Sequence, residues 1–449
     1  MARVAVIGTG ISGLSAAYLL HPFHDITVYE KERRVGGHTR TVTVRYDGRD
    51  IPVDTGFIVF NRPNYPHFSA MLRHLGVPVH ESNMTFAASI QDGWFEWGAE
   101  NLNTVFGQRR NFLRPAFYGV CRDVMHFNAK AIETVERHPG LTLEGLIRKL
   151  GLGDWFRRYY ILPMGGAIWS CPLSEMLEFP ARTFVRFFQN HGLLAFNGQP
   201  QWYTVTGGAQ NYINRLTQAF ARRIRTGLGV RTVLRTGGGI EVIDQKGSRE
   251  SFDHVVFACH GNEALAALGD ADEMERRTLG AFRYQKNDMV LHKDASVMPR
   301  RKRCWAAWNY RSEGEAEDAA VSVSYWMNRL QGIDRAYPIF VTLNPSRSIA
   351  PEHVFDRHVF DHPVFDAAAI AAQNRLQAMQ GVRNTWFCGA HLRHGFHEDG
   401  LWSAVNVALR LGAKIPWNTA SEAVRRDAAA ALGAWHPAGP ENLAESPAS

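Results

Sequence analysis

Three glycines near the start of the chain are spaced so that the backbone between them can bind a phosphate. Gly8, Gly10 and Gly13 follow the apolar residues 4–7. Gly8 allows a tight turn, Gly10 lets the backbone approach a pyrophosphate, and Gly13 lets a helix pack closely on a strand. The start of that helix aims free N–H groups and the positive end of its dipole at an anion. The spacing predicts a dinucleotide site.

The elements that must position these glycines lie in the same segment. Residues 4–7 and 26–29 are predicted strands, and residues 14–20 are a predicted helix between them. Glu30 ends the second strand, where a carboxylate can accept hydrogen bonds from a ribose. Together these elements form the βαβ unit that the glycine spacing requires. We expect two further residues of the turn to face the phosphates, Ile11 and Ser12.

A second glycine pair indicates which dinucleotide is bound. It follows Glu30 within a few residues, and an Asp-Thr-Gly stretch comes later, at residues 54–56. This arrangement resembles the flavoproteins of the two-dinucleotide-binding type, which implies FAD and not NAD alone. Two unrelated turns remain the alternative. The usual pattern has Arg after the glycine pair, where this chain has His38. The resemblance assigns to FAD the residues Lys31, Gly36, Gly37, His38, Thr55 and Gly56.

Composition is that of a large enzyme with a substantial core. The chain has 449 residues, of which 45% are hydrophobic and 21% charged. The predicted strand at residues 4–7 leaves no room for a signal peptide, and no apolar run reaches the ~18 residues of a membrane span. The five cysteines form no Cys-x-x-Cys pair, and no spacing suggests a metal site. We therefore expect a cytoplasmic protein with reduced thiols and no bound metal.

The C-terminal part of the chain contains a strand that ends in glycine and a following helix, at residues 385–404. This pattern resembles the flavin-containing amine oxidase and phytoene desaturase superfamily, whose C-terminus returns to the FAD. The likeness places Gly389 and Asp399 beside the pyrophosphate and ribityl chain. It places the backbone of Gly400 and Leu401 at the flavin pyrimidine, where a helix N-terminus stabilises the anionic reduced ring. Further residues that the likeness assigns to FAD are Val230 and Ser403.

The predicted fold class is α/β, with a Rossmann-like FAD-binding domain and an interleaved α+β substrate domain. The FAD-binding domain is expected to be discontinuous, from residues 1–60, 200–268 and 380–415. The substrate domain is expected from 61–199, mostly helical in pattern, and from 269–379. Residues 418–449 are rich in Ala, Glu, Pro and Gly, which predicts a poorly ordered tail.

A narrower resemblance covers nearly the whole chain. Residues 53–61, 162–170, 178–184 and 395–400 look like a bacterial group of predicted NAD/FAD-binding proteins that accompany cyclopropane-fatty-acid-synthase-like methyltransferases. One member type is the desaturase of furan fatty acid biosynthesis. This implies an oxidoreductase that desaturates methylated, unsaturated phospholipid acyl chains by hydride transfer to flavin N5. A lipid methyltransferase is the implied partner.

Catalytic candidates cluster just before the C-terminal helix. His391, His394, His397 and Glu398 could accept the proton that desaturation releases, although each could instead hold the loop. Two weaker candidates are His38 and Tyr325. Amine oxidases usually hold a Lys near flavin N5, and the matching position here is Asn287, with Lys286 on the opposite strand face. The covalent-attachment motif Gly-Cys-Tyr is missing, so we expect non-covalent FAD.

Residues 105–160 are rich in Arg and aromatic residues, in a chain whose net charge is +7. Such a segment could lie on anionic lipid at the inner face of the cytoplasmic membrane, or its arginines could simply solvate helices. No nucleic-acid-binding motif is present. Two other functions stay open: a soluble amine or amino-acid oxidase that recruits Trp326 or Arg182, and a non-catalytic FAD-bound partner of a methyltransferase. The electron acceptor, the double-bond position and the oligomeric state stay undetermined by the sequence.

Overall fold

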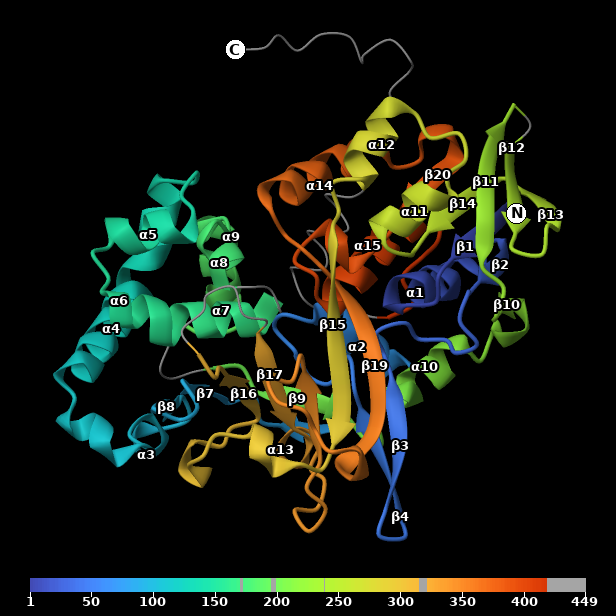
Figure 1. Cartoon of the computed structure of the whole chain (residues 1–449). Coiled ribbons are helices and arrows are strands. Elements are labelled where there is room, and N and C mark those ends of the chain that lie inside the picture. The colour runs from blue at the N-terminus through green and yellow to red at the C-terminus, as the bar shows by residue number, and fades with distance from the viewer. Residues whose placement is uncertain (170–172, 195–198, 238, 315–320, 418–449) are drawn as a thin grey trace.

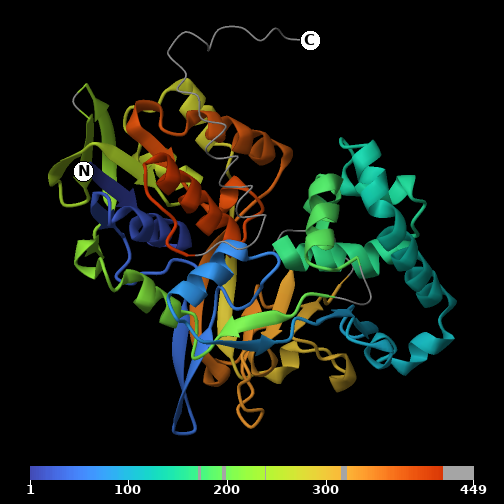
Figure 2. The same ribbon diagram turned by 180° about the vertical axis from the view of Figure 1, so that it is seen from behind.

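The computed structural model describes residues 1–169, 173–194, 199–237, 239–314 and 321–417. The predicted tail lies outside these ranges, as do Ser170, which ends the segment 162–170, and Cys171. The described chain has three regions: a parallel sheet with its helices, a larger mixed sheet, and a lobe of helices (Figure 1). Seen from behind, the helical lobe and the parallel sheet stand on opposite sides of the mixed sheet (Figure 2).

A parallel sheet of five strands contains the N-terminus. Its strand order is β10-β2-β1-β14-β20, and every strand comes from the three ranges predicted for FAD binding. Along β1, Val4 and Val6 pack into one core and Ala5 and Ile7 into another, because successive side chains point to opposite faces. The strands are β1 Arg3–Ile7, β2 Asp25–Tyr29, β10 Ile224–Arg225, β14 His254–Phe257 and β20 Thr385–Phe387.

Each face of this sheet is covered, as a parallel sheet requires. Helices α1, α2, α10 and α15 contribute to one core, and α11, α12 and α14 lie with a three-stranded antiparallel sheet on the other side. In that sheet β11 and β12 are neighbours in the chain and pair antiparallel. The bounds are α1 Ile11–Leu20, α2 Pro66–His74, α10 Gln210–Thr217, α11 Gly261–Ala267, α12 Glu273–Leu279, α14 Ala367–Met379, α15 His397–Arg410, β11 Val230–Thr236, β12 Gly239–Asp244 and β13 Arg249–Phe252.

The larger sheet has seven strands in the order β19-β15-β18-β17-β16-β7-β8. Two smaller sheets, β3-β4 and β5-β9-β6, are separate from it. The strands are β3 Thr41–Tyr46, β4 Arg49–Asp54, β5 Phe60–Asn61, β6 Val79–Ser82, β7 Phe86–Ile90, β8 Phe95–Gly98, β9 Trp202–Val205, β15 Tyr284–His292, β16 Trp308–Arg311, β17 Ser322–Trp326, β18 Phe340–Leu343 and β19 Val354–Pro363, with the short helix α13 Met327–Leu330.

The prediction that residues 61–199 are mostly helical is confirmed for α2 and for the lobe that follows β8, but it misses three strands. Strands β6, β7 and β8 occupy residues 79–98, because these short runs gain their stability from pairing with the distant β9 and β16. Such long-range pairing leaves little periodicity in a short segment.

The helical lobe begins after β8 and has its own aromatic core. Pro139 and Gly140 lie between α4 and α5 and separate the two helices. No helix in the described part of the chain is long and apolar enough to span a membrane. The elements of the lobe are α3 Leu102–Val105, η1 Arg109–Leu113, α4 Pro115–Arg137, α5 Leu143–Lys149, α6 Asp154–Phe156, η2 Arg157–Ile161, α7 Leu162–Trp169, α8 Leu173–Leu177 and α9 Ala181–Asn190.

Candidate cofactor and substrate site

The first glycine turn lies between β1 and α1, and its glycines have different neighbours. A Cβ on Gly13 would lie 2.0 Å from the carbonyl oxygen of Gly8, so only glycine lets α1 pack this closely. Gly8 has a φ of +105° and donates its N–H to Tyr29 O at 2.8 Å. A Cβ on Gly10 would meet nothing within 4 Å. Open space at the N-terminus of α1 is what a bound pyrophosphate needs.

Glu30 stands at the end of β2, where a carboxylate that accepts hydrogen bonds from a ribose is expected. It is 8% exposed, and its carboxylate accepts the N–H of Thr9 at 3.0 Å and that of Glu32 at 2.9 Å. These bonds hold the carboxylate beside the glycine turn. Lys31, the next predicted residue, forms an ion pair with Glu263 at 2.6 Å.

The second glycine pair packs directly on the first turn. A Cβ on Gly37 would lie 2.8 Å from the Gly10 Cα, and one on Gly56 would lie 2.0 Å from the His38 carbonyl oxygen. Arg34, which the sequence analysis did not select, donates to the carbonyls of Thr39 and Gly37, each at 2.7 Å. Its guanidinium therefore fixes the turn that contains the glycine pair.

The C-terminal strand and helix predicted to return to the FAD lie against the first glycine turn. A Cβ on Gly400 would lie 2.8 Å from Ile11 Cγ2 and from Ser12 Oγ, so the N-termini of α1 and α15 meet. Ser403 Oγ accepts the Gly389 N–H at 2.9 Å and donates to Gly400 O at 2.7 Å. Two helix N-termini at one point favour a negatively charged ligand.

Three other predicted residues border this region. Leu401 is fully buried in the first turn of α15. Asp399 accepts the N–H of Phe396 at 2.9 Å, and burial raises the pKa of its carboxyl. Val230 opens β11, two residues beyond Leu228, whose N–H donates to Glu30 O at 2.9 Å. We call residues 8–13, 30–38, 54–57 and 389–403 the cofactor cradle.

A cavity of about 360 Å³ lies against the cradle. Residues of the cradle, among them Ile11, His38, Gly56 and Ala390, form one side of it, and residues of the mixed sheet and the helical lobe form much of the remainder. His38 is largely exposed to this interior space although protein surrounds it. The apolar and aromatic residues of the lining are Phe57, Ile58, Val59, Tyr65, Met84, Phe86, Met164, Ile168, Trp169, Phe187, Leu193, Trp202, Trp308, Tyr325, Leu330, Pro363, Phe365 and Phe396.

Comparison with known proteins decides the family. Residues 11–270, more than half of the chain, match the model of the flavin-containing amine oxidoreductases. The chain belongs to this family. FAD is therefore its cofactor, and the cradle fits it through the open space at Gly10, the two helix N-termini and the carboxylate of Glu30.

Individual relatives of this flavin-containing amine oxidoreductase are distant. The putative flavin-containing monoamine oxidase AofH of Mycobacterium tuberculosis is 25% identical over 258 residues. That match covers 55% of each chain, so this chain spans about half the length of the curated relatives it matches.

Solved structures of similar fold cover nearly the whole chain. A CLA-producing fatty acid isomerase from P. acnes has a TM-score of 0.65 at 16% identity, covering 91% of this chain and 98% of its own. Putrescine oxidase bound to putrescine has 0.64 at 15%, covering 92% and 99%. Cyclohexylamine oxidase from Brevibacterium oxydans has 0.62 at 15%, with the same coverage. At such identities the likeness shows the fold alone, and it confirms the predicted α/β class.

Two of the four predicted catalytic residues line the cavity, His394 and His397. The His397 ring stacks on Phe57 with centroids 3.8 Å apart, and its Nε2 hydrogen-bonds the Tyr212 hydroxyl at 2.6 Å. Burial lowers the pKa of His397 to about 3, and burial also lowers that of His394. Both imidazoles are therefore neutral at neutral pH.

The other two candidates face away from the cavity lining. The Glu398 carboxylate accepts the N–H of His67 at 2.8 Å and of Phe68 at 2.9 Å, which caps the N-terminus of α2. Burial raises the pKa of Glu398 to about 8, against these two bonds, which lower it. His391 is buried edge-on to Phe282, and burial lowers its pKa to about 3. These contacts suit positioning roles, and catalysis by either residue stays a prediction.

Further histidines at the cavity escaped the sequence analysis. His362 of β19 lies 5.1 Å from His38, centroid to centroid, and burial lowers the pKa of His362 to about 4. His260, which precedes α11, and His191, which follows α9, line the same space. These side chains are far apart in sequence, so no local spacing could have grouped them. Tyr325, a weaker candidate, also lines the cavity and stacks on Trp308.

A buried asparagine occupies the position at which amine oxidases usually hold a Lys. Asn287 is fully buried on β15, and its Oδ1 accepts a hydrogen bond from Asn344 at 2.7 Å. It pairs across the strands with Phe360, whereas Lys286 pairs with Asp361 and is exposed. The predicted opposite faces of Asn287 and Lys286 are therefore confirmed.

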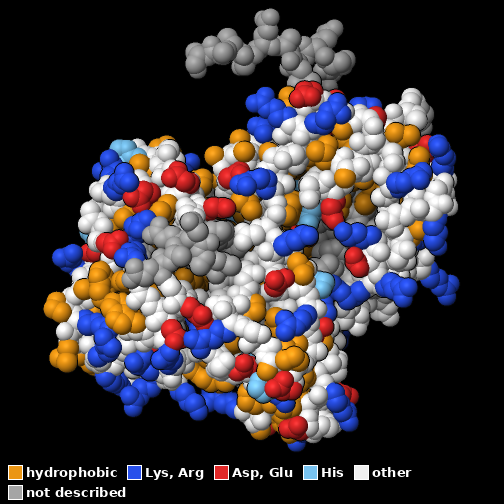
Figure 3. Space-filling model, viewed as in Figure 1, with side chains coloured by type: hydrophobic (Ala, Val, Ile, Leu, Met, Phe, Trp, Pro, Cys, Tyr) orange, Lys and Arg blue, Asp and Glu red, His pale blue; other side chains and the backbone are white. Residues whose placement is uncertain are grey.

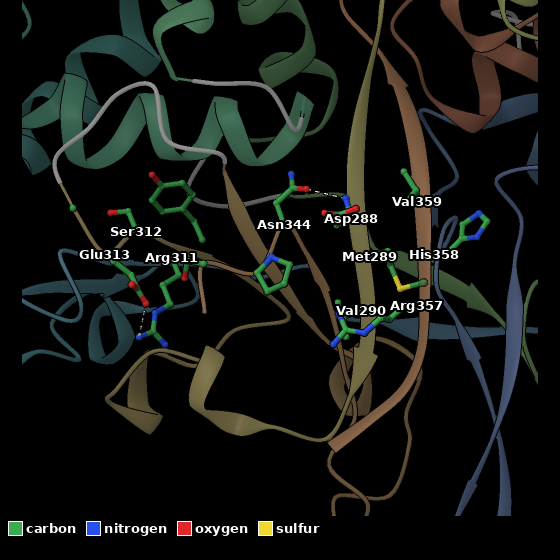
Figure 4. Close-up of a pocket in the computed structure, with 14 residues that line it drawn as sticks. Asp288, Met289, Val290, Arg311, Ser312, Glu313, Asn344, Arg357, His358 and Val359 are labelled. Atoms are coloured by element: carbon green, nitrogen blue, oxygen red, sulfur yellow. Dashed lines mark hydrogen bonds and ion pairs between the residues drawn. The ribbon is translucent and has the colours of Figure 1, made fainter. Parts of the chain in front are cut away.

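A larger opening of about 770 Å³ lies on the other face of β15 and β19 (Figure 4). Asp288 and Val290 pair there with Val359 and Arg357, and strand alternation turns these side chains away from His362. Its described lining includes none of the residues assigned to FAD. We therefore place the reaction in the smaller cavity, which adjoins the cradle.

Proposed function

We propose that this FAD-dependent oxidoreductase desaturates an apolar acyl chain, and that its substrate is a methylated, unsaturated acyl chain of a phospholipid. The lining of the cavity beside the cradle carries the proposal. Most of its described residues are aliphatic or aromatic, and none of them is Lys or Arg. An acyl chain is uncharged along its length and gains about 0.8 kcal/mol per buried CH₂ group, so such a cavity suits it.

The chemistry needs one hydride acceptor and one proton acceptor. Desaturation removes a hydride from one carbon and a proton from its neighbour, and the allylic hydrogens of a methylated alkene are the weakest. Bound FAD supplies the two-electron acceptor for the hydride. His394, His397 and His362 are neutral imidazoles along the cavity, and because burial lowers their pKa values, an imidazole there would relay the proton to water and not keep it.

Two further observations are compatible with this substrate. A CLA-producing fatty acid isomerase from P. acnes has a similar fold. The narrower sequence resemblance also points to lipid methyltransferases as the enzymes that supply the methylated substrate.

Lipid analysis tests the substrate directly. A bacterial strain that expresses this chain beside a lipid methyltransferase should accumulate methylated dienes, and a strain with the methyltransferase alone should retain the methylated monoenes. Unchanged methylated monoenes in both strains would contradict the proposal. In vitro, hydrogen peroxide released from a panel of amines but not from methylated phospholipids would also overturn it.

Amine oxidation is the second candidate, and the similarity of this chain to a putative monoamine oxidase, to putrescine oxidase and to cyclohexylamine oxidase favours it. The residues that the sequence offered for it do not line the cavity. Arg182 forms an ion pair with Glu136 on the surface of α9, and Trp326 packs edge-on against Trp305. Asp361 is the one acidic residue of the described lining, and strand alternation turns its side chain away from His362. Asp361→Asn should therefore leave turnover unchanged, and a selective loss with amines would support this second function.

A further inference from the structure

One edge of the helical lobe exposes an unusual group of large apolar side chains. Leu113 is 86% exposed and Leu102 is 77% exposed, although leucine side chains are usually buried. Phe112, Tyr118 and Met125 beside them are each about half exposed. Hydrophobic side chains gather next to Lys and Arg over the region of α3 and α4, at the lower left of Figure 3. We call residues 102–118 and 301–303 the docking edge.

A basic groove of about 520 Å³ forms the other half of the docking edge. Its lining includes Arg109 and Arg110 from η1, Arg301, and Lys302 and Arg303 from the short helix η5 Lys302–Cys304. The two segments touch, because a Cβ on Gly107 would lie 2.5 Å from Cys304 Sγ. Residues 102–122 contain four arginines and no acidic residue.

Most of these cations keep their charge uncompensated. Arg301 forms an ion pair with the buried Glu96 at 2.9 Å. Across the described ranges, no carboxylate lies within ion-pair distance of Arg109, Arg110, Lys302 or Arg303. Four side chains of one sign on one groove favour a ligand surface with several anionic groups.

The apolar part of the docking edge is held in a fixed shape. The Phe112 ring stacks on Phe106 with centroids 4.2 Å apart and planes within 4°. The Tyr118 hydroxyl donates to Phe112 O at 3.1 Å, which ties η1 to α4. Leu113 therefore projects from an ordered turn, and its exposure is a property of the fold.

We propose that the docking edge binds the surface of an anionic phospholipid bilayer. Leu102, Phe112 and Leu113 enter the boundary between headgroups and acyl chains, and the groove cations contact lipid phosphates. A nucleic acid would use the cations and the aromatic rings but would leave the two exposed leucines in water. This surface is separate from the reaction cavity, so the inference does not depend on the proposed substrate.

Only part of residues 105–160, the segment predicted to lie on a membrane, belongs to this surface. Trp155 and Tyr159 pack on Phe95 inside the lobe. The Arg114 guanidinium lies 4.5 Å from the Trp94 ring centroid and donates to backbone and side-chain acceptors. Trp155 and Tyr159 therefore lie inside the lobe and Arg114 is held against Trp94, whereas Lys302 and Arg303, outside the predicted segment, join the binding surface.

Vesicle co-sedimentation of the full FAD-loaded chain tests the inference. Vesicles that contain phosphatidylglycerol should bind the wild type at least ten-fold more tightly than pure phosphatidylcholine, with binding weakened by salt. A variant with Gln at Arg109, Arg110, Lys302 and Arg303 should lose at least ten-fold in affinity. A separate variant, Leu102→Gln with Leu113→Gln, should lose the binding that survives high salt.

Matched control variants change exposed cations or exposed apolar side chains elsewhere on the surface. Gln at Arg222, Lys246, Arg276 and Arg277, or Met274→Gln with Val382→Gln, should bind vesicles as the wild type does. Equal vesicle binding by the docking-edge variants and the wild type would overturn the inference, as would an equal loss in the controls. Tight binding to single-stranded RNA that needs the cations but not the leucines would assign the surface to nucleic acid instead. Flavin content and methylated-lipid turnover in detergent should stay unchanged in every variant, which separates docking from catalysis.

Discussion

The cofactor cradle and the substrate cavity lie against each other but are built in different ways. In the cradle, glycines bring backbone segments together so closely that a Cβ at Gly13, Gly56 or Gly400 would lie within 2.8 Å of a neighbouring atom. In the cavity, side chains from the parallel sheet, the mixed sheet and the helical lobe converge. The cradle therefore depends on the absence of side chains, and the cavity depends on which side chains are present.

This difference predicts that substitutions in the two regions change different properties. Cradle variants should alter FAD binding and folding, and cavity variants should alter substrate binding with FAD unchanged. Four predictions test whether the two regions differ in this way, in order of decreasing expected effect.

Gly13→Ala should have the largest effect. Its Cβ would lie 2.0 Å from Gly8 O, so α1 must move away from β1. We expect FAD affinity to fall by more than ~100-fold and the apoprotein to lose stability, since overpacking costs about 1–3 kcal/mol or more. Gly10→Ala is the control: its Cβ meets nothing in the chain, so it should weaken FAD binding without lowering apoprotein stability. Normal FAD titration of Gly13→Ala would break the account of the cradle.

Ile168→Trp should change the cavity without changing the cradle. Ile168 lies on α7 and lines the cavity, so a larger ring takes space from an acyl chain. We expect kcat/KM for long acyl chains to fall about 10- to 100-fold, consistent with the loss of several buried CH₂ groups. FAD affinity, measured by flavin fluorescence, should stay the same. Ile132→Trp on α4 is the matched control, because Ile132 does not line the cavity. An equal loss of kcat/KM in that variant would show that the loss does not arise in the cavity.

Acid should destabilise the region where the cradle and the cavity meet. Burial holds the pKa of His391 at about 3, below its usual 6.5. Between these values the unfolded chain binds the proton and the folded chain does not, so the unfolding free energy falls as pH falls through this window. One such histidine costs about 2 kcal/mol from pH 6.5 to pH 5. Denaturant unfolding of His391→Leu should show a correspondingly flatter pH dependence, and an unchanged slope would argue against a buried neutral ring.

Ser403→Ala should have the smallest effect. It removes the hydroxyl that joins Gly389 N to Gly400 O, so one buried N–H loses its partner at a cost of about 1–3 kcal/mol. We expect FAD affinity to fall about five- to ten-fold. Ser15→Ala is the control, because the buried Ser15 hydroxyl has no hydrogen-bond partner among the described residues. If both variants bind FAD equally, Ser403 does not position the cradle.

The same difference explains how much of the molecule could be predicted from its sequence. The glycine turn and Glu30 form a local pattern, and the C-terminal return was found through its resemblance to a family. The strands of residues 79–98 were missed because they pair with β9 and β16 far along the chain. His362 and His260 were missed for the same reason, since only the folded topology brings them to the cavity. Arg34 could have been noticed, because it stands next to the glycine pair whose carbonyls it binds.

The central claim is that the cavity beside the cradle presents an acyl chain to FAD. Anaerobic mixing of the FAD-loaded chain with a methylated, unsaturated phospholipid, followed by its visible absorbance, tests this most directly. We predict that the lipid reduces the bound flavin and that Ile168→Trp slows the reduction. Reduction by amines but not by the lipid would contradict the claim, and a flavin that no substrate of either class reduces would support a non-catalytic FAD-bound partner.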